Sequence, residues 1–423
     1  MRYYIGFIFS PLLFFIAAGC GETEEAPEVY LTEGLRFRPL KDFKYERTDA
    51  RKERGKYLTE SVMQCFACHS ERDWSKPGGP VIESKKGGGA VIYDSDSYRM
   101  VAPNISPDEE TGAGKWTDDM FARAIREGIG HDGRALGGNM WYWSFRNLSD
   151  EDLASVIVYL RTIPPVKNKL PKRKISQELQ KLIIKEPMPL YKPVLSPDLT
   201  NEIERGKYLV KIADCDGCHS AWEAPFNPGL LGGGNFIQNY DSAFSSNITF
   251  DISGISYDEN VFIDIMRTGK SRTLKKVMPW IVFKNMTDED LKAIYAFLKT
   301  VKPVKHFVNN ISPPVKCKAC GQVHGFGEAN TEFKTAVVST ELYNDYAGKY
   351  MFEDSLTIKI YREDAKLMIH EDGYDPSECL PVSENEFRYV SEGMNITFHR
   401  DKKNKVTHLV FHHLDNEVAK KIV

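Results

Sequence analysis

The sequence predicts a multidomain protein in which two all-α domains are followed by a small antiparallel all-β domain. A segment with helical hydrophobic periodicity occurs twice along the chain, whereas residues 338–423 alternate polar and apolar side chains with a period of two. A length of 423 residues, 42% of them hydrophobic and 27% charged, fits several soluble domains with buried cores. The net charge of −3 gives no indication of nucleic-acid binding.

Residues 1–20 are predicted to be a lipoprotein signal peptide. Arg2 precedes a short apolar core that Ser10 and Pro11 interrupt, and small residues then lead to Cys20. This core is too short for a transmembrane helix and is typical of a secretory signal. The end of the segment resembles the lipobox of bacterial lipoproteins, with Ala17 where that family usually has leucine. The resemblance implies that Cys20 is lipidated.

The alternative is an ordinary signal peptide that is cleaved nearby. Both interpretations place the mature chain outside the cytoplasm, and lipidation would make it a membrane lipoprotein facing the periplasm or the cell surface. Residues 21–50 begin with an acidic, proline-containing stretch and are expected to be a flexible tether.

An internal repeat organises residues 51–306. The hexapeptide "ERGKYL" occurs at 53–58 and again at 204–209, and a Cys-x-x-Cys-His-Ser motif follows each copy. Later segments also match, including "SFRNLSDEDL" and "VFKNMTDEDL". We therefore expect a duplicated domain at 51–166 (the first copy) and 201–306 (the second copy). The basic and then proline-rich residues 167–200 are expected to be a solvated linker with a short helix.

Each copy is expected to be helical. "ERGKYLTESVMQCFACH" is compatible with one helix that carries the motif at its end. Ser149 and Thr287 are expected to be the N-caps of the last helix in each copy, and Asp152 and Asp290 would complete a capping box. A proline follows each of these helices and ends it.

Three interpretations compete for the Cys-x-x-Cys-His motifs. A structural zinc site needs four nearby ligands, and neither copy has a second cysteine pair at a suitable distance. A thioredoxin-like dithiol needs a parallel sheet, which the helical pattern does not predict. In the third interpretation each motif binds haem c: its cysteines form thioethers and its histidine binds the iron. The duplication favours covalent haem, with the residues Cys65, Cys68 and His69 in one copy and Cys215, Cys218 and His219 in the other.

The repeat also selects a second iron ligand. A ligand needed in both copies should recur at equivalent positions, and neither His131 nor His306 does so. Met140 and Met278 do recur, in front of the same final helix. Methionine is more often a packing residue, but recurrence in a variable loop favours a ligand. Two protein ligands would leave no open position for a substrate, so the chain is expected to carry electrons.

Neighbouring residues support a cavity around each iron. Trp141 and Trp280 follow the methionines and could exclude water from a porphyrin edge. Arg134 and Arg272 each lie six residues before the methionine and could pair with the haem propionates. The alternative for both arginines is an ordinary surface position.

The motifs "PNISPDEETGAGKWTDDMFARAIREG" and "SFRNLSDEDLASVIVYLRTIPPV" resemble the repeated cytochrome c domains of membrane-associated alcohol and gluconate dehydrogenase cytochrome subunits. The resemblance covers about residues 50–306. It implies His69 with Met140 and His219 with Met278 as axial ligands, two covalently bound haem c groups, a dehydrogenase as electron donor and a cytochrome or oxidase as acceptor. Those subunits typically carry three haems, whereas this chain has two motifs and a different tail.

Residues 307–337 are expected to be a joint that a cysteine pair pins. Cys317 and Cys320 form a Cys-x-x-Cys that glycine follows instead of histidine, which argues against a third haem. A local disulfide, a zinc site with His324 and Cys379, and free thiols all stay open.

Residues 338–423 resemble the small lipocalin-like β domain that is appended to penicillin-binding-protein-like hydrolases. The "Y…GKY" start and the rhythm of about eight short strands carry this resemblance, and a small sheet or an up-and-down barrel is expected. No Ser-x-x-Lys motif precedes the tail, so no hydrolase activity follows. His408 and His412 would share one face of a strand. They could form a metal site, or they could simply be exposed to solvent. An interaction or packing role is expected.

The favoured function is therefore a lipid-anchored di-haem c-type cytochrome that is an electron carrier rather than an enzyme. One alternative is a two-haem peroxidase, which needs one five-coordinate iron. The other is a sensor or binding module in which the β tail takes a ligand.

Overall fold

The computed structural model describes residues 37–137, 140–222, 227–237, 243–270, 277–308, 310, 315–316, 323–324, 335–353, 356–412 and 416–422. Its contacts divide the chain into two compact units. The first contains the residues up to Cys215 together with Gln238–Tyr240 and Pro279–Ile294, and the second contains Asp216–Ile237, Asp241–Met278 and Tyr295–Val423.

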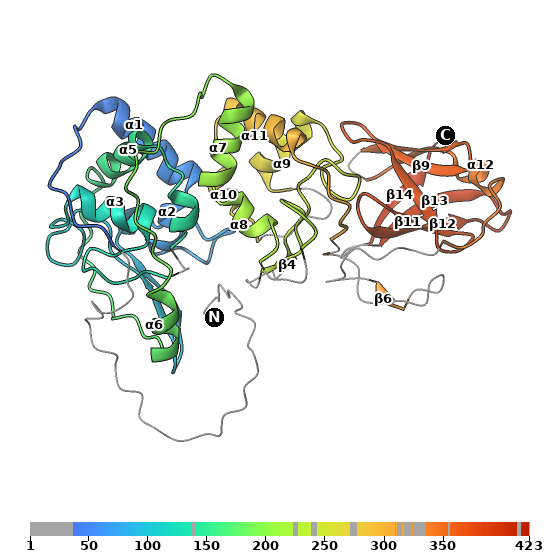
Figure 1. Ribbon diagram of the computed structural model, residues 1–423. Helices are drawn as coiled ribbons and strands as arrows, with labels where there is room; N and C mark the ends of the chain where they lie inside the picture. The colour runs from blue at the N-terminus through green and yellow to red at the C-terminus, as the bar shows by residue number, and fades with distance from the viewer. Residues whose placement is uncertain are drawn as a thin grey trace. The chain divides into compact units, whose positions relative to one another are not determined.

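The first copy is built around the packing of two short helices (Figure 1). Helix α1 (Asp49–Tyr57) begins after Thr48, whose hydroxyl accepts from the amide of Arg51, and it packs against α5 (Asp150–Leu160). The helices touch at Gly55, where an added Cβ would lie 1.9 Å from the Ser155 carbonyl oxygen. Only glycine allows this approach, which explains the glycine of the "ERGKYL" motif.

The helix that carries the motif is not continuous. Helix α1 passes into a π-helical turn, η1 (Leu58–Val62), and Gln64 then adopts a left-handed conformation with φ of 58°. A new helical turn, α2 (Cys65–Cys68), follows. The second copy has the same interruption, because Asp214 (φ 59°) separates α7 (Glu202–Ile212) from α8 (Cys215–His219). The break in each copy sets the direction of the cysteine-bearing turn independently of the preceding helix.

The remaining elements of the two copies also correspond. In the first copy they are β1 (Ala90–Asp94), β2 (Arg99–Ala102), α3 (Asp118–Glu127), α4 (Tyr142–Phe145) and α5, while η2 (Glu83–Lys85) has no counterpart among the described residues of the second copy. In the second copy they are β3 (Phe236–Ile237), β4 (Ala243–Phe244), α9 (Glu259–Thr268), α10 (Trp280–Phe283) and α11 (Asp288–Thr300). The predicted caps of the last helices are present, because Ser149 and Thr287 accept hydrogen bonds from the amides of Asp152 and Asp290.

Within the first unit, a tyrosine in the first helix of each copy donates a hydrogen bond to an aspartate at the start of the last helix of the other copy. The Tyr57 hydroxyl donates to Asp290, and the Tyr208 hydroxyl donates to Asp152 over 2.8 Å. Each aspartate is also paired with the arginine of its own copy: Asp290 with Arg205 and Asp152 with Arg54. The "ERGKYL" and "DEDL" segments thus form two equivalent clusters related by the repeat.

The segment between the copies is ordered against the first copy. Lys174 and Arg99 form an antiparallel bridge with two backbone hydrogen bonds of 2.7 and 3.0 Å, and α6 (Gln177–Ile183) follows. Ser176 caps α6 by accepting from the amide of Leu179.

The C-terminal residues form a closed eight-stranded barrel. After α12 (Leu342–Tyr346), the strands are β7 (Gly348–Met351), β8 (Thr357–Glu363), β9 (Lys366–Glu371), β10 (Ser377–Pro381), β11 (Glu386–Tyr389), β12 (Met394–Arg400), β13 (Val406–His412) and β14 (Glu417–Lys421). Each strand pairs antiparallel with the next, and β14 pairs with β7 to close the barrel. Its interior is filled by a core that includes Tyr346, Tyr350, Phe387, Phe398 and Phe411.

The predicted fold class, two all-α cytochrome c domains followed by a small antiparallel all-β domain, is wrong. Each copy contains a two-stranded antiparallel sheet, β1–β2 or β3–β4. The twelve α-helices of the described residues are short, with at most 13 residues each. The tail is a closed eight-stranded barrel, which is one of the two forms expected for it. The prediction followed helical periodicity and overlooked the β-branched and aromatic run "AVIYD" beside the glycine-rich loop.

Two further β strands, β5 (Val315–Lys316) and β6 (Val323–His324), pair within the predicted joint. Among the described residues, no helix combines the length and the hydrophobicity needed to cross a bilayer.

Candidate cofactor site

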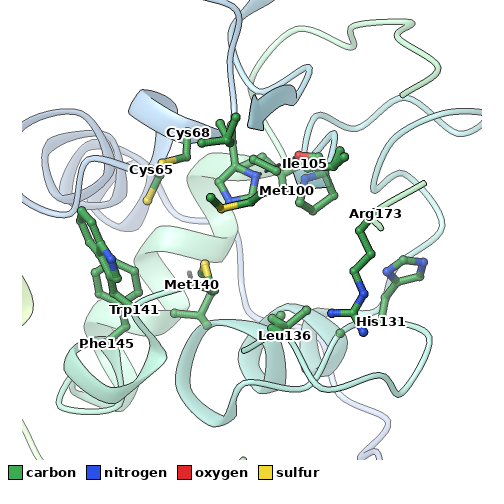
Figure 2. A pocket seen from close by; sticks show the side chains of 18 of the residues that line it. Cys65, Cys68, Met100, Ile105, His131, Leu136, Met140, Trp141, Phe145 and Arg173 are labelled. Carbon is green, nitrogen blue, oxygen red and sulfur yellow. Dashed lines mark hydrogen bonds between the residues drawn. The ribbon is translucent and has the colours of Figure 1, made fainter. Parts of the chain in front are cut away.

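The cysteines and the histidine of the first motif line one cavity. The single turn of α2 brings Cys65 and Cys68 to the same wall, and His69 ends the turn. Met140 lies in the facing wall, two residues before α4, and its side chain points into the cavity (Figure 2). The structure therefore brings together the four residues predicted to hold the first haem.

The His69 ring is held in one chemical form. Its Nδ1 atom lies 2.9 Å from the carbonyl oxygen of Pro103, which can only accept, so Nδ1 carries the proton and Nε2 keeps a lone pair. Burial lowers the pKa of His69, which keeps the ring neutral at pH 7. A neutral imidazole with its second nitrogen fixed by a carbonyl is the form that binds metals.

The second copy holds its histidine by the same device. Nδ1 of His219 donates to the Ser246 carbonyl oxygen over 2.7 Å, and burial lowers the pKa of His219 as well. Pro103 and Ser246 each directly precede an asparagine, Asn104 or Asn247, whose side-chain amide donates over 2.7 Å to a backbone carbonyl after the last helix. The same asparagine thus fixes the carbonyl-bearing loop in both copies.

The thiols of the first motif are uncharged. Burial raises the pKa of Cys65 to about 12 and also raises the pKa of Cys68. Both thiols therefore stay protonated at pH 7. Two half-buried thiols on one helical turn that line the cavity suit thioether formation with a bound porphyrin.

Most of the cavity lining is apolar. Residues of α3, α4, α5 and the β1–β2 hairpin contribute, among them Ile92, Met100, Phe121, Ile125, Phe145 and Val156. Figure 2 shows Trp141 and Phe145 near Cys65. An apolar slot between an imidazole and a thioether, with two thiols on one wall, fits a haem c group.

The other predicted site residues lie in the cavity, in the second copy, or outside the described residues. Arg134 lines the cavity and forms an ion pair with Asp132. Met278 is half-buried and lies two residues before α10, as Met140 lies before α4. The predicted residues Cys20, Arg272, Cys317 and Cys320 lie outside the described residues.

His131, His306 and Cys379 are each packed or hydrogen-bonded against other residues of the protein. His131 stacks on Trp116 with ring centroids 4.3 Å apart at the edge of the cavity. His306 is buried, and its Nδ1 donates to the Gly232 carbonyl oxygen over 2.6 Å. Cys379 is 1% exposed in the barrel core, where it is not available to a shared zinc site.

Sequence reasoning missed Arg173, which lies in the predicted solvated linker and lines the cavity together with Ile175 and Ile183. The signal was the brief amphipathic stretch after the basic run, since apolar residues at helical spacing in a linker need a surface to cover.

Comparisons with known proteins agree with this geometry. The chain is 29% identical over 280 residues to the alcohol dehydrogenase (quinone) cytochrome c subunit of Gluconacetobacter polyoxogenes, covering 60% of this chain and 56% of that protein. It is 27% identical over 344 residues to the fructose dehydrogenase cytochrome subunit of Gluconobacter japonicus, covering 77% and 66%. It is 30% identical over 183 residues to the gluconate 2-dehydrogenase cytochrome c subunit of Pantoea cypripedii, covering 41% and 38%.

The resemblance to dehydrogenase cytochrome c subunits is thereby confirmed, and these relatives are consistent with electron transfer. The chain spans at most 66% of the length of these three relatives. No family model matches the chain.

Proposed function

We propose that this chain is an electron-transfer c-type cytochrome with two covalently bound haem c groups, one in each copy. Cys65, Cys68, Cys215 and Cys218 would attach them, with His69 and Met140 as axial ligands in the first copy and His219 and Met278 in the second. The observation that carries this proposal is the first cavity, where a neutral imidazole with a free Nε2 and a methionine line the same apolar slot.

Bound haem c supplies an iron atom that alternates between its ferric and ferrous states. The residues of the chain then set how this change is used. An imidazole and a thioether together leave no position for a substrate, which favours a carrier over a peroxidase. The apolar lining keeps water away, and Arg134 and Arg272 would pair with propionates.

The names of the relatives support a dehydrogenase as the electron donor. We infer a cytochrome or oxidase as the acceptor, an extracytoplasmic location, and a membrane anchor through lipidated Cys20. The domains would be a signal peptide (1–20), a tether (21–50), two haem domains (51–166 and 201–306) around a linker (167–200), a joint (307–337) and a lipocalin-like β domain (338–423). Because side chains fill the barrel, a role in packing or protein contact is favoured over ligand binding.

The experiment that tests this function is spectroscopy of the full chain produced with a cytochrome c maturation system. Covalent haem measured as the pyridine haemochrome should reach two per chain, and the oxidised protein should show a far-red methionine–iron band. Met140→Ala and Met278→Ala should each remove about half of that band.

Met100→Ala is the matched control, because Met100 lines the same cavity but has no counterpart in the second copy. It should leave the band intact. A protein in which one haem lacks the band before mutation, and which turns over peroxide, would show the carrier proposal to be wrong.

A further inference from the structure

The segment between the copies brings a cation to the first cavity. The backbone bridge between Arg99 of β2 and Lys174 fixes the chain at this point, and Arg173 directly precedes the bridge. Arg173 lines the cavity, and α6 follows with Ile183 in the same lining. The position of Arg173 is thus set by strand pairing on one side and by helix packing on the other.

The hydrogen bonds of Arg173 go to neutral oxygens. One Nη donates to the Ala135 carbonyl over 3.0 Å, and the other donates to the Gln180 side-chain oxygen over 2.9 Å. Arg134 lines the same part of the cavity, and its carboxylate partner is Asp132. Two guanidinium groups therefore meet one carboxylate here, which leaves one positive charge in excess.

This excess has an electrostatic consequence. Burial, and then repulsion by Arg134, lower the pKa of Arg173 to about 10, so it is still protonated at pH 7 but is poorly compensated. A half-buried cation in this state would gain from an anionic partner within the cavity.

The position of Arg173 relative to the two cysteines indicates the source of such an anion. Figure 2 shows Arg173 and His131 at the end of the cavity away from Cys65 and Cys68. In haem the vinyl groups, which form the thioethers, and the propionates lie on opposite edges of the ring. A ring attached at the cysteines would therefore direct its propionates toward Arg173.

The sequence of the second copy has no arginine at the position equivalent to Arg173. Asn168 and His306 occupy matching places, because their side chains donate to the carbonyls of Gly88 and Gly232. Counting from them, the counterpart of Arg173 is Ile311, and residues 304–313 read "VKHFVNNISP", without arginine. The sequence therefore has a positive charge at this position in the first copy and an apolar residue in the second.

We propose that Arg173 from the linker, together with Arg134, binds the propionates of the first haem and raises the reduction potential of that haem alone. This inference rests on the proposed function, because it requires haem in the first cavity. A nearby positive charge stabilises the reduced state, since reduction adds one electron to the site, and the effect is strong where water is excluded.

The test is a redox titration of the full holoprotein, with each haem followed by its absorbance. Arg173→Gln removes the charge and should shift one of the two transitions to lower potential without moving the other. Arg173→Lys keeps the charge and should restore most of the shift. The matched control is Lys172→Gln, which removes an exposed charge from the neighbouring position and should change neither transition.

The haemochrome of each variant is measured first. Fewer than two haems in the unmutated chain would contradict the proposed function itself. Two haems with transitions that Arg173→Gln leaves unchanged, or that Lys172→Gln shifts equally, would overturn the role of Arg173 while the proposed function stands.

Discussion

The two copies of the repeat hold their histidines identically but cover the neighbouring space differently. In both copies a carbonyl next to an asparagine fixes Nδ1, and a residue with positive φ precedes the cysteine turn. The first copy adds a bulged hairpin over 90–102 and the arginine-bearing linker, whereas the second has a pair of two-residue strands. After the second copy, the Asn310 side chain makes two hydrogen bonds to the backbone of Phe244, where the first copy uses backbone pairing.

This difference shows which parts of the duplicated domain the chemistry restricts. The turn, the histidine and its carbonyl must keep their geometry for a ligand to reach the same place. The strands and linker around the site are free to differ between the copies. Their charge and the burial they provide set the reduction potential of an otherwise identical site. Four predictions examine this comparison.

The largest expected effect comes from removing one anchor at a time. Cys65→Ala with Cys68→Ala should lower covalent haem from two per chain to one, and Cys215→Ala with Cys218→Ala should do the same, because each pair attaches its own group. The measurement is the pyridine haemochrome per mole of purified chain. Loss of both haems from one double variant would show that the copies do not load independently.

The next effect concerns the close contact of α1 with α5. Gly55→Ala places a methyl group 1.9 Å from the Ser155 carbonyl oxygen, so the helices must separate. We expect a loss of about 2–3 kcal/mol in the free energy of unfolding, measured by urea denaturation. Lys56→Ala, at the exposed neighbouring position, is the control and should change stability little. An unchanged midpoint for Gly55→Ala would contradict the observed packing.

A smaller effect tests the equivalence of the two tyrosine–aspartate clusters. Tyr57→Phe and Tyr208→Phe each remove one hydroxyl from a charged acceptor, so each should cost about 1–2 kcal/mol of unfolding free energy. Tyr191→Phe is the control, because Tyr191 is 72% exposed. Thermal unfolding of the single and double variants measures the costs. Markedly unequal losses of unfolding free energy would show that the two clusters have the same hydrogen bonds but do not stabilise the protein equally.

The smallest effect is a pH dependence at one position that the two copies fill differently, with Asn168 in the first copy and His306 in the second. Burial lowers the pKa of His306 below its ordinary 6.5, so the stability it contributes is present above pH 6.5 and is lost as the pH falls toward the folded-state pKa. The loss is about 1.4 kcal/mol for each pH unit of depression. His306→Asn, which installs the residue of the first copy, should reduce the slope of unfolding free energy between pH 5 and about 7. Asn168→His should increase that slope; equal slopes in all three proteins would contradict the comparison.

The motifs could be located from sequence because the repeat provides an internal alignment. It singled out Met140, and Met140 does line the cavity with His69, as do Met63 and Met100, which have no counterparts in the second copy. The helix caps at Ser149 and Thr287 are also local patterns, and both were correct. The all-α description was wrong, because short β-branched runs near glycine-rich loops carry little helical or strand periodicity of their own.

The sequence by itself determined the duplication, the cysteine and histidine positions and the strand-rich tail, because these depend on residue type and spacing within short segments. Only the tertiary structure decided that His69 and Met140 share a cavity, that the barrel closes through β14 and β7, and that Arg173 lies at the cavity rather than in solvent. The physical reason is that these features depend on contacts between residues far apart in the chain. A basic run has the same composition whether water or a cavity surrounds it, and its role depends on the surface against which the chain packs.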